Sequence, residues 1–375
     1  MPPQLTTRIS ARAVAALVSF AVALAIVAPF FWLGNASGHD FEFHLRSWVD
    51  AAHSWRAGVW FPRWAELANY KFGEPRFIFY PPLSWMLGAA LSFVLPWKMV
   101  PGAFCVLVLA LAGVTMFTLA RDYLPPTDAV LAGALYLANP YSLLVVYFRS
   151  AFAELLVAAL LPLVVLYALR LPHMRWRAVA PLALVVGLVW LTNAPGAVTT
   201  TYALALLLAV LAWQERSAAP LVLGSVAIAI GLMLAAAYII PAMVEQPWVR
   251  ISEVLSAGLR VDENFLFTRI ADLEHTRFNF IVSWVAVGEM AALALAGWAA
   301  FRGAALARAR GPLATLGALS VVLMFRFTAP LWRLVPKAEF IQFPWRWLFV
   351  LGIVYALALA AALQDFRPRA FAYAG

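Results

Sequence analysis

Long apolar segments alternate with short polar ones along most of the chain. Ten apolar segments approach the roughly 20 residues that an α-helix needs to cross a membrane, so each predicts one spanning helix. They cover residues 13–33, 101–120, 127–147, 154–171, 178–193, 197–214, 220–240, 281–301, 312–328 and 346–363. Another stretch, Leu83–Leu95, has about thirteen residues between prolines, a length more typical of a re-entrant or interfacial helix. The pattern predicts an all-α integral membrane protein of about ten transmembrane helices.

The basic residues indicate which helix ends face the cytoplasm. If Leu83–Leu95 does not cross, nearly all basic loops fall on one side, as the positive-inside rule requires. We therefore expect a cytoplasmic N-terminus, a first outer loop over residues 34–100 and a second over 241–280. Both belong to a single membrane domain, 1–375, without a C-terminal soluble domain. The inner basic residues are then Arg8, Arg12, Arg121, Arg170, Arg175, Arg177, Arg216, Arg302, Arg308, Arg310, Arg367 and Arg369.

Composition agrees with a membrane protein. Hydrophobic residues make up 65% of the chain and charged residues 12%, whereas soluble domains have about 45–50% and about 25%. The net charge of +9 reflects the inner loops, since no basic run is interleaved with aromatics as nucleic-acid binding requires. The single cysteine, Cys105, lies in an apolar run. An intrachain disulfide is therefore excluded.

The first outer loop begins with a pattern for an amphipathic helix that lies flat on the membrane. Its apolar positions recur at helical spacing, and its polar positions point elsewhere. The apolar positions are Phe41, Leu45, Trp48, Val49 and Ala52, and the polar ones are Glu42, Arg46, Asp50 and His53. Aromatic residues further along the loop, Trp60, Phe61, Trp64, Phe77, Phe79 and Tyr80, are typical of the membrane–water interface.

Asp40 stands immediately before this helix and has two compatible interpretations. It is well placed as an N-cap that accepts free backbone amides. A carboxylate at a wet membrane face can also act as a general base, or hold a metal together with Glu42 or His44. The spacing of His39, His44 and His53 matches no recognised zinc pattern. The loop therefore predicts carboxylate chemistry more strongly than a histidine metal site.

Further ionisable residues fall at the outer ends of predicted spanning helices. Arg149 and Glu154 lie at the junction of two spans, where charged groups are costly and usually functional. Glu245 in YIIPAMVEQPWV and Arg346 in IQFPWRWLF also lie at outer helix ends. An arginine there is either a snorkelling anchor or a phosphate ligand, because guanidinium matches phosphate with paired donors. These residues are candidates for substrate binding.

The chain resembles the membrane glycosyltransferases of the GT-C fold, in which an outer loop with an acidic pair follows the first helix. More narrowly, the segments GHDFEFHL, FYPPL, YFRSAFAELLVAALLPL, IIPAMVEQPWV and IQFPWRWL are similar to the bacterial membrane proteins labelled 6-pyruvoyl-tetrahydropterin-synthase-related. The resemblance implies that Asp40 corresponds to the first-loop acid of the GT-C fold and Glu154 to the second-loop acid. It also implies a location in a bacterial inner membrane.

The leading hypothesis is an inverting glycosyltransferase that uses a polyprenyl-phosphate-linked sugar at the periplasmic face. Asp40 would take the proton of the acceptor, a glycan, lipid or protein, while Arg149 or Arg346 neutralises the departing phosphate. Glu154 and Glu42 would orient the acceptor or a divalent cation, Mg²⁺ or Mn²⁺. His44 and Glu245 complete the candidate substrate-binding residues.

Two other functions stay open at this point. One is a transporter or flippase for a lipid-linked or polar substrate, although such proteins usually have repeated halves and ionisable residues near the membrane midplane. In this sequence the acids gather at one face and no repeat is visible. The other is a non-catalytic membrane subunit of an envelope-assembly complex, which the expected lack of a soluble domain keeps open.

Overall fold

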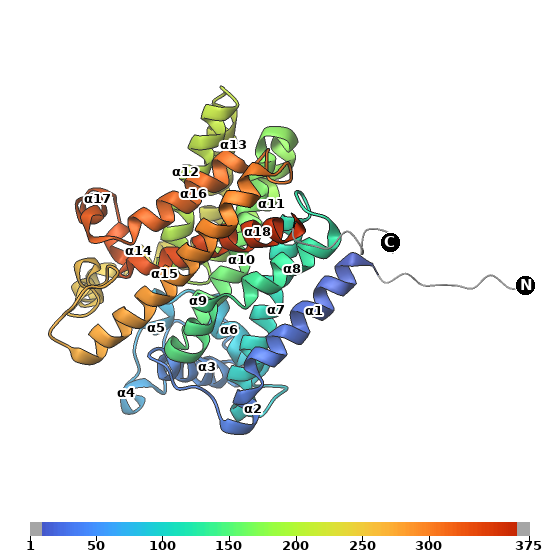
Figure 1. The fold of residues 1–375 in the computed structure, drawn as a ribbon. Coiled ribbons are helices and arrows are strands. Elements are labelled where there is room, and N and C mark those ends of the chain that lie inside the picture. The colour runs from blue at the N-terminus through green and yellow to red at the C-terminus, as the bar shows by residue number, and fades with distance from the viewer. Residues whose placement is uncertain (1–9, 366–375) are drawn as a thin grey trace, which may run out of the picture.

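The computed structural model describes residues 10–365, which form a bundle of helices (Figure 1). Within these residues, seven helices are long and apolar enough to cross a membrane. They are α1 (Ala11–Val27) with α2 (Pro29–Leu33), η1 (Trp97–Met99) with α7 (Val100–Ala120), α8 (Pro126–Leu137) with α9 (Pro140–Leu144) and the π-helix η2 (Val145–Arg149), α10 (Phe152–Met174), α12 (Ala194–Gln214), α15 (Leu273–Arg302), and η8 (Pro344–Trp347) with α18 (Leu348–Asp365).

The other three predicted spans are bent or short. Helices α13 (Ala219–Leu234) and α14 (Ala236–Val244) meet at 73°. Helix α16 (Arg310–Leu323) meets η6 (Arg326–Thr328) and α17 (Ala329–Leu334) at 93°, and α11 (Trp176–Trp190) has 15 residues. The hydrophobic pattern does not reveal these bends, because apolar residues suit both arms of a bent span. The predicted all-α membrane fold with about ten spans is confirmed.

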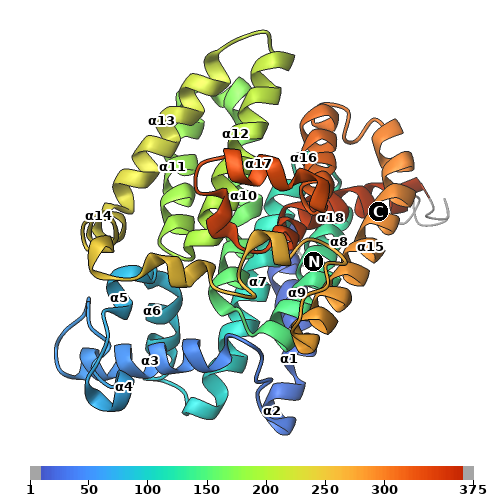
Figure 2. The same ribbon diagram turned by 90° about the vertical axis from the view of Figure 1, so that its left-hand side faces the viewer.

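The predicted first outer loop, residues 34–100, forms a layer across one end of the spanning helices, which we call the outer layer. Figure 2 shows its longest helix, α3 (Phe41–Arg56), running crosswise below the bundle, with α6 (Pro82–Leu91) packed on it. The short α4 (Ala68–Lys71) and α5 (Arg76–Phe79) complete this layer. Helix α6 therefore packs within this layer. Elsewhere, three 3-10 helices follow α14, namely η3 (Gln246–Trp248), η4 (Ile251–Leu255) and η5 (Val261–Glu263). Another, η7 (Ala338–Ile341), follows α17.

Asp50 belongs to the polar positions of α3 but is buried. Its carboxylate is 2% exposed and accepts the Leu67 N–H at 2.7 Å. The Arg76 guanidinium lies 3.7 Å from it. The helical pattern could not show this, because the loop after α3 folds back over that face of the helix. Arg8, Arg367 and Arg369 lie outside the described residues.

Proline and small polar residues determine where many helices begin. Helices α6, α8, α9, α12 and α13 each carry proline in the first turn, where its missing N–H costs nothing. The side chains of Ser10, Asn139, Asn193 and Asp272 accept amides at the starts of α1, α9, α12 and α15. These caps satisfy backbone donors that the apolar surroundings cannot.

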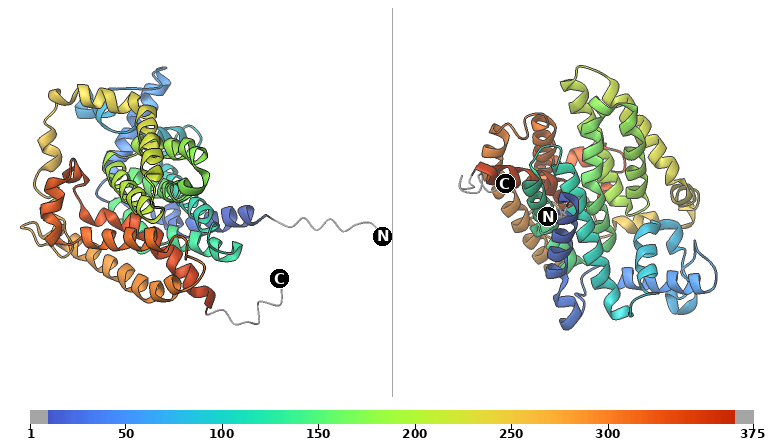
Figure 3. Two further views of the ribbon diagram at one scale, coloured as in Figure 1. Left: turned by 90° about the horizontal axis from the view of Figure 1, so that it is seen from above. Right: turned by 90° about the vertical axis from the view of Figure 1, so that its right-hand side faces the viewer.

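Helix α10 forms the centre of the bundle and is the most buried of the seven spans. Helices α11–α13 lie on one side of it and α15, α16 and α18 on the other (Figures 2 and 3). Helices α7 and α8 approach closely at two glycines. A Cβ on Gly133 would lie only 2.6 Å from the Gly113 carbonyl oxygen, so a larger residue would not fit there. Such small residues drive helix packing in membranes. The two most buried spans, α10 and η8–α18, carry Glu154 and Arg346 into one place.

Candidate active site

The segment before α3 is bound directly to the end of the π-helix η2. The Asp40 N–H donates to the Arg149 carbonyl oxygen at 2.8 Å, and the Gly38 N–H donates to Ser150 Oγ at 3.1 Å. A Cβ on Gly38 would lie 2.5 Å from the Phe148 carbonyl oxygen, so only glycine fits this approach. Ser150 adopts a left-handed conformation with φ 49°, and π-helical turns are frequent at functional sites. The contact places Asp40 beside Arg149.

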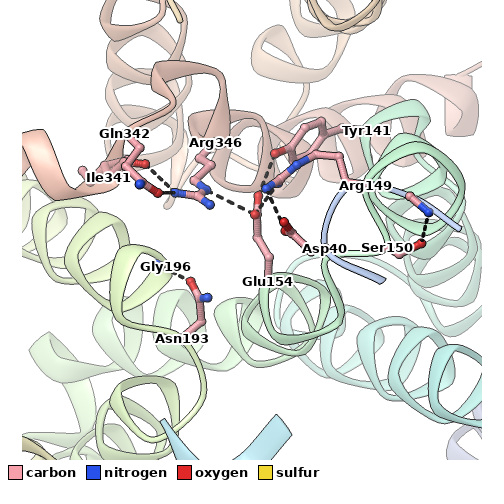
Figure 4. A network of polar contacts seen from close by, with 11 residues as sticks. Asp40, Tyr141, Arg149, Ser150, Glu154, Asn193, Gly196, Ile341, Gln342 and Arg346 are labelled. Carbon is pink, nitrogen blue, oxygen red and sulfur yellow. Dashed lines mark hydrogen bonds and ion pairs between the residues drawn. The ribbon is translucent and has the colours of Figure 1, made fainter. Parts of the chain in front are cut away.

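Glu154 binds two guanidinium groups, one five residues earlier in the chain and one 192 residues later (Figure 4). Its Oε2 accepts from Arg149 Nη1 and, at 3.1 Å, from Arg346 Nε. Its Oε1 accepts from the Tyr141 hydroxyl at 2.8 Å. Arg149 Nη2 also donates to Asp40 Oδ2 at 3.3 Å. The structure therefore brings together four of the predicted site residues, and we call Asp40, Tyr141, Arg149, Glu154 and Arg346 the polar network.

The members of the polar network differ sharply in exposure. Glu154, Arg149 and Arg346 are 2%, 3% and 6% exposed, whereas the Asp40 side chain is 42% exposed. Buried charges of this kind are tolerated when they are paired and hydrogen-bonded. Asp40 is the member that a substrate can reach from the outer layer.

Aromatic rings from the segment before α18 cover both arginines. The Arg149 guanidinium lies 4.9 Å from the Trp345 ring centroid, and that of Arg346 lies 4.6 Å from Phe343. Arg346 Nη1 also donates to the Ile341 carbonyl oxygen at 2.5 Å. These cation–π and hydrogen-bond contacts hold the guanidinium planes in fixed orientations. The motif IQFPWRW thus builds one wall of the site.

The segment FYPPL is bound to the α11–α12 junction and to α14. The Leu83 N–H donates to the Leu191 carbonyl oxygen at 2.8 Å, and the Tyr238 hydroxyl donates to the Phe79 carbonyl oxygen at 3.2 Å. Asn193 caps α12, and Figure 4 shows its carboxamide below Arg346 and Glu154. These contacts fix the outer layer against the spanning helices around the polar network.

Asp40 belongs to the polar network, whereas Glu42 and Glu245 lie outside it. Asp40 occupies the N-cap position of α3, but its side chain caps no amide of that helix, since it turns toward Arg149. Glu42 is exposed and pairs with Arg46. Glu245 ends α14 and forms no ion pair within residues 10–365.

His44 lies one helical turn after Asp40 and is buried among aromatic rings. Its ring centroid is 5.3 Å from that of Phe152 and 6.0 Å from that of Tyr80. Burial lowers the pKa of His44 to about 4, so the imidazole is neutral at neutral pH. Within residues 10–365, no group of three or more His, Cys, Asp or Glu side chains could hold a metal ion.

The sequence analysis missed Tyr141, Gln342 and Glu289. Gln342 contacts Arg346 Nη1 through Oε1 at 3.3 Å. Glu289 lies within α15, is 0% exposed and accepts the Tyr141 N–H at 3.0 Å. A lone carboxylate inside a predicted span was a readable signal, because such groups are costly and functional in membranes.

Removing the carboxylate of Glu289 should destabilise the fold. Glu289→Leu leaves the buried Tyr141 N–H without its acceptor, which is expected to lower the free energy of unfolding by about 1–3 kcal/mol. Glu289→Gln keeps an acceptor oxygen and should lose less. Denaturant unfolding of the two variants in detergent measures the difference. Equal unfolding midpoints for Leu, Gln and wild type would contradict the role of this contact.

Comparisons with known proteins agree with this architecture. The family model described as "6-pyruvoyl-tetrahydropterin synthase related domain; membrane protein" matches residues 77–374. No curated protein matches the chain.

Two solved structures share the fold. ArnT from Cupriavidus metallidurans, solved bound to undecaprenyl phosphate, superposes with TM-score 0.55 and 16% identity over 95% of this chain and 60% of its own. The apo oligosaccharyltransferase of Archaeoglobus fulgidus gives TM-score 0.53 and 14% identity over 99% of this chain and 52% of its own. The chain thus has the GT-C fold and spans just over half the length of these neighbours. Because the family model covers most of its residues, the protein belongs to the 6-pyruvoyl-tetrahydropterin-synthase-related membrane proteins.

Proposed function

We propose that the protein is an inverting glycosyltransferase that uses a polyprenyl-phosphate-linked sugar at the outer face of a bacterial inner membrane. The observation that carries this proposal is the polar network. It joins an exposed carboxylate, Asp40, to two buried guanidinium groups at the outer ends of spanning helices. Such a site offers a proton acceptor and two phosphate ligands at the depth where a lipid phosphate lies.

Asp40 is the proposed general base. It would accept the proton of the acceptor hydroxyl as that oxygen attacks the anomeric carbon from the face opposite the phosphate. Arg149 and Arg346 would stabilise the negative charge on the departing phosphate. Glu154 is enclosed by its three partners, so we assign it to positioning the arginines rather than to contact with the sugar.

An apolar pocket beside Arg346 supports a lipid-linked donor. It has a volume of about 150 Å³ and is lined by Trp332, Ile341 and Trp347 among others. Trp347 follows Arg346 directly, and the Ile341 carbonyl oxygen accepts from that guanidinium. A prenyl chain whose phosphate reaches Arg346 would find apolar surface next to it.

Several details remain predictions within this proposal. Glu42, His44 and Glu245 are retained as residues that contact the acceptor or the sugar away from the arginines. If a divalent cation, Mg²⁺ or Mn²⁺, takes part, Asp40 together with Glu42 would hold it, and it would supply positive charge to stabilise the departing phosphate. The fold of the ArnT and oligosaccharyltransferase neighbours supports the proposal at the level of architecture.

Transfer from a labelled donor tests the proposed function. Purified full-length protein in lipid nanodiscs is incubated with polyprenyl-phosphate sugars that carry a radioactive sugar, together with candidate glycan, lipid and peptide acceptors. We expect label to leave the lipid fraction in a time-dependent reaction that heat-treated protein does not support. Repetition with EDTA measures any need for a divalent cation. Binding of the donor without release of sugar would instead favour a non-catalytic subunit.

A further inference from the structure

The charges of the polar network balance without substrate. Arg149 and Arg346 supply two positive charges, and Glu154 and Asp40 supply two negative charges. A lipid phosphate would add a further negative charge to this neutral cluster at the edge of the membrane, where charge imbalance is costly. The arginines can therefore hold a phosphate most easily if it takes the place of one carboxylate.

The two carboxylates differ in how firmly they are held. Both oxygens of Glu154 are hydrogen-bonded, it has three partners, and the residue is 2% exposed. The Asp40 carboxylate has one contact with the network, at 3.3 Å from Arg149 Nη2, and the side chain is 42% exposed. A contact of this length is a weak hydrogen bond, and water can solvate Asp40 when the contact is lost. Asp40 is the carboxylate that an incoming anion can displace.

The backbone around Asp40 is fixed while its side chain is free to turn. The Asp40 N–H donates to the Arg149 carbonyl oxygen at 2.8 Å, and Gly38 lies tightly against Phe148. Release of the carboxylate from Arg149 therefore needs only side-chain rotation into the exposed space. The freed carboxylate remains within the same turn of backbone and so stays beside the bound phosphate.

We infer that the donor phosphate displaces Asp40 from Arg149 and thereby converts an ion-paired carboxylate into the general base. This inference rests on the proposed function and concerns the same site. A phosphate oxygen accepts from Arg149 in place of Asp40 Oδ2. Asp40 then takes the acceptor proton as the new bond to the anomeric carbon forms, and the electrons of the breaking bond pass to the phosphate oxygen. The base is therefore available only when the donor is bound.

This displacement predicts that Asp40→Asn binds a prenyl phosphate more tightly than wild type. Asparagine removes the negative charge that competes with the phosphate for Arg149. An ion pair with one exposed partner is worth little, so the affinity should rise about twofold to fivefold. If Asp40 instead held the phosphate through a cation, Asp40→Asn would lower the affinity, because the substitution would remove a ligand of that cation.

The experiment measures the affinity for farnesyl phosphate of full-length protein in phosphatidylcholine nanodiscs. The matched control is Asp262→Asn, because the Asp262 side chain is 46% exposed and pairs with Arg333 at 2.7 Å in the outer loop. We expect a lower Kd for Asp40→Asn and an unchanged Kd for Asp262→Asn. A Kd for Asp40→Asn equal to or higher than that of wild type overturns the inference. An equal gain of affinity in Asp40→Asn and Asp262→Asn overturns it as well.

The same measurements separate this inference from the proposed function. Tighter binding in Asp40→Asn without sugar transfer by wild type would support displacement and reject the transferase. Sugar transfer by wild type without tighter binding in Asp40→Asn would reject displacement alone. If neither protein binds farnesyl phosphate, both proposals fail. Farnesol, which lacks the phosphate, should bind both proteins equally, and a difference there would show that Asp40→Asn alters the apolar pocket instead.

Discussion

Glu154→Gln is expected to lower the free energy of unfolding by about 3–5 kcal/mol, the usual cost of removing one partner from a buried ion pair. The substitution leaves Arg149 and Arg346 close together in the interior without the carboxylate that both contact. Denaturant titration of the purified protein, followed by tryptophan fluorescence, measures the loss.

Glu42→Gln provides the control for this measurement. Glu42 forms an ion pair with Arg46, but its side chain is 73% exposed. Glu42→Gln should therefore change the free energy of unfolding little. A Glu154→Gln protein as stable as Glu42→Gln would contradict the role of the polar network in joining α10 to η8. A large loss of unfolding free energy in both variants would point to a general effect of removing a negative charge.

Asp40→Asn is expected to lower the rate of sugar transfer by about 10²- to 10⁴-fold, the usual contribution of a positioned general base. The protein should stay folded, because the Asp40 side chain is 42% exposed and has a single contact with the network. Initial rates at saturating donor measure the effect, so that a change in donor affinity does not obscure it. Asp262→Asn should transfer at the wild-type rate. A rate for Asp40→Asn within tenfold of wild type would remove Asp40 from the base role.

The spans could be predicted from the sequence because membrane crossing depends on local composition. Ten apolar segments predicted the bundle. The length of the segment after FYPPL predicted a helix that does not cross the membrane, and the helix formed there, α6, packs on α3. The bends after Leu234 and Leu323 could not be predicted. Both arms of each bend are apolar, so the hydrophobic pattern continues through it.

The site was predictable residue by residue but not as a geometry. Arg149, Glu154 and Arg346 were identified as charges at the ends of predicted spans, and Asp40 as the carboxylate immediately before the amphipathic helix of the first outer loop. Their assembly depends on contacts across up to 192 positions of sequence, such as that between Arg346 and Glu154, which no local pattern encodes. The close approach of Gly38 to Phe148 is of the same kind.

Two carboxylates show where pattern analysis fails. Asp50 was placed on the polar face of α3, but the following loop covers that face and Asp50 accepts the Leu67 amide. Glu289 was overlooked because the apolar run around it dominated its segment. Its contact with the Tyr141 N–H becomes visible only when α15 is packed against α9.

Photo-crosslinking with a donor analogue tests the central claim, the position of the lipid phosphate, most directly. A polyprenyl phosphate that carries a diazirine near the phosphate is bound to the protein in nanodiscs and irradiated. The labelled peptides are then mapped by mass spectrometry. The account predicts label on the segments that contain Asp40, Arg149 and Arg346, and its loss when unlabelled undecaprenyl phosphate competes. Competable label confined to the inner segment around Arg302–Arg310 would contradict it.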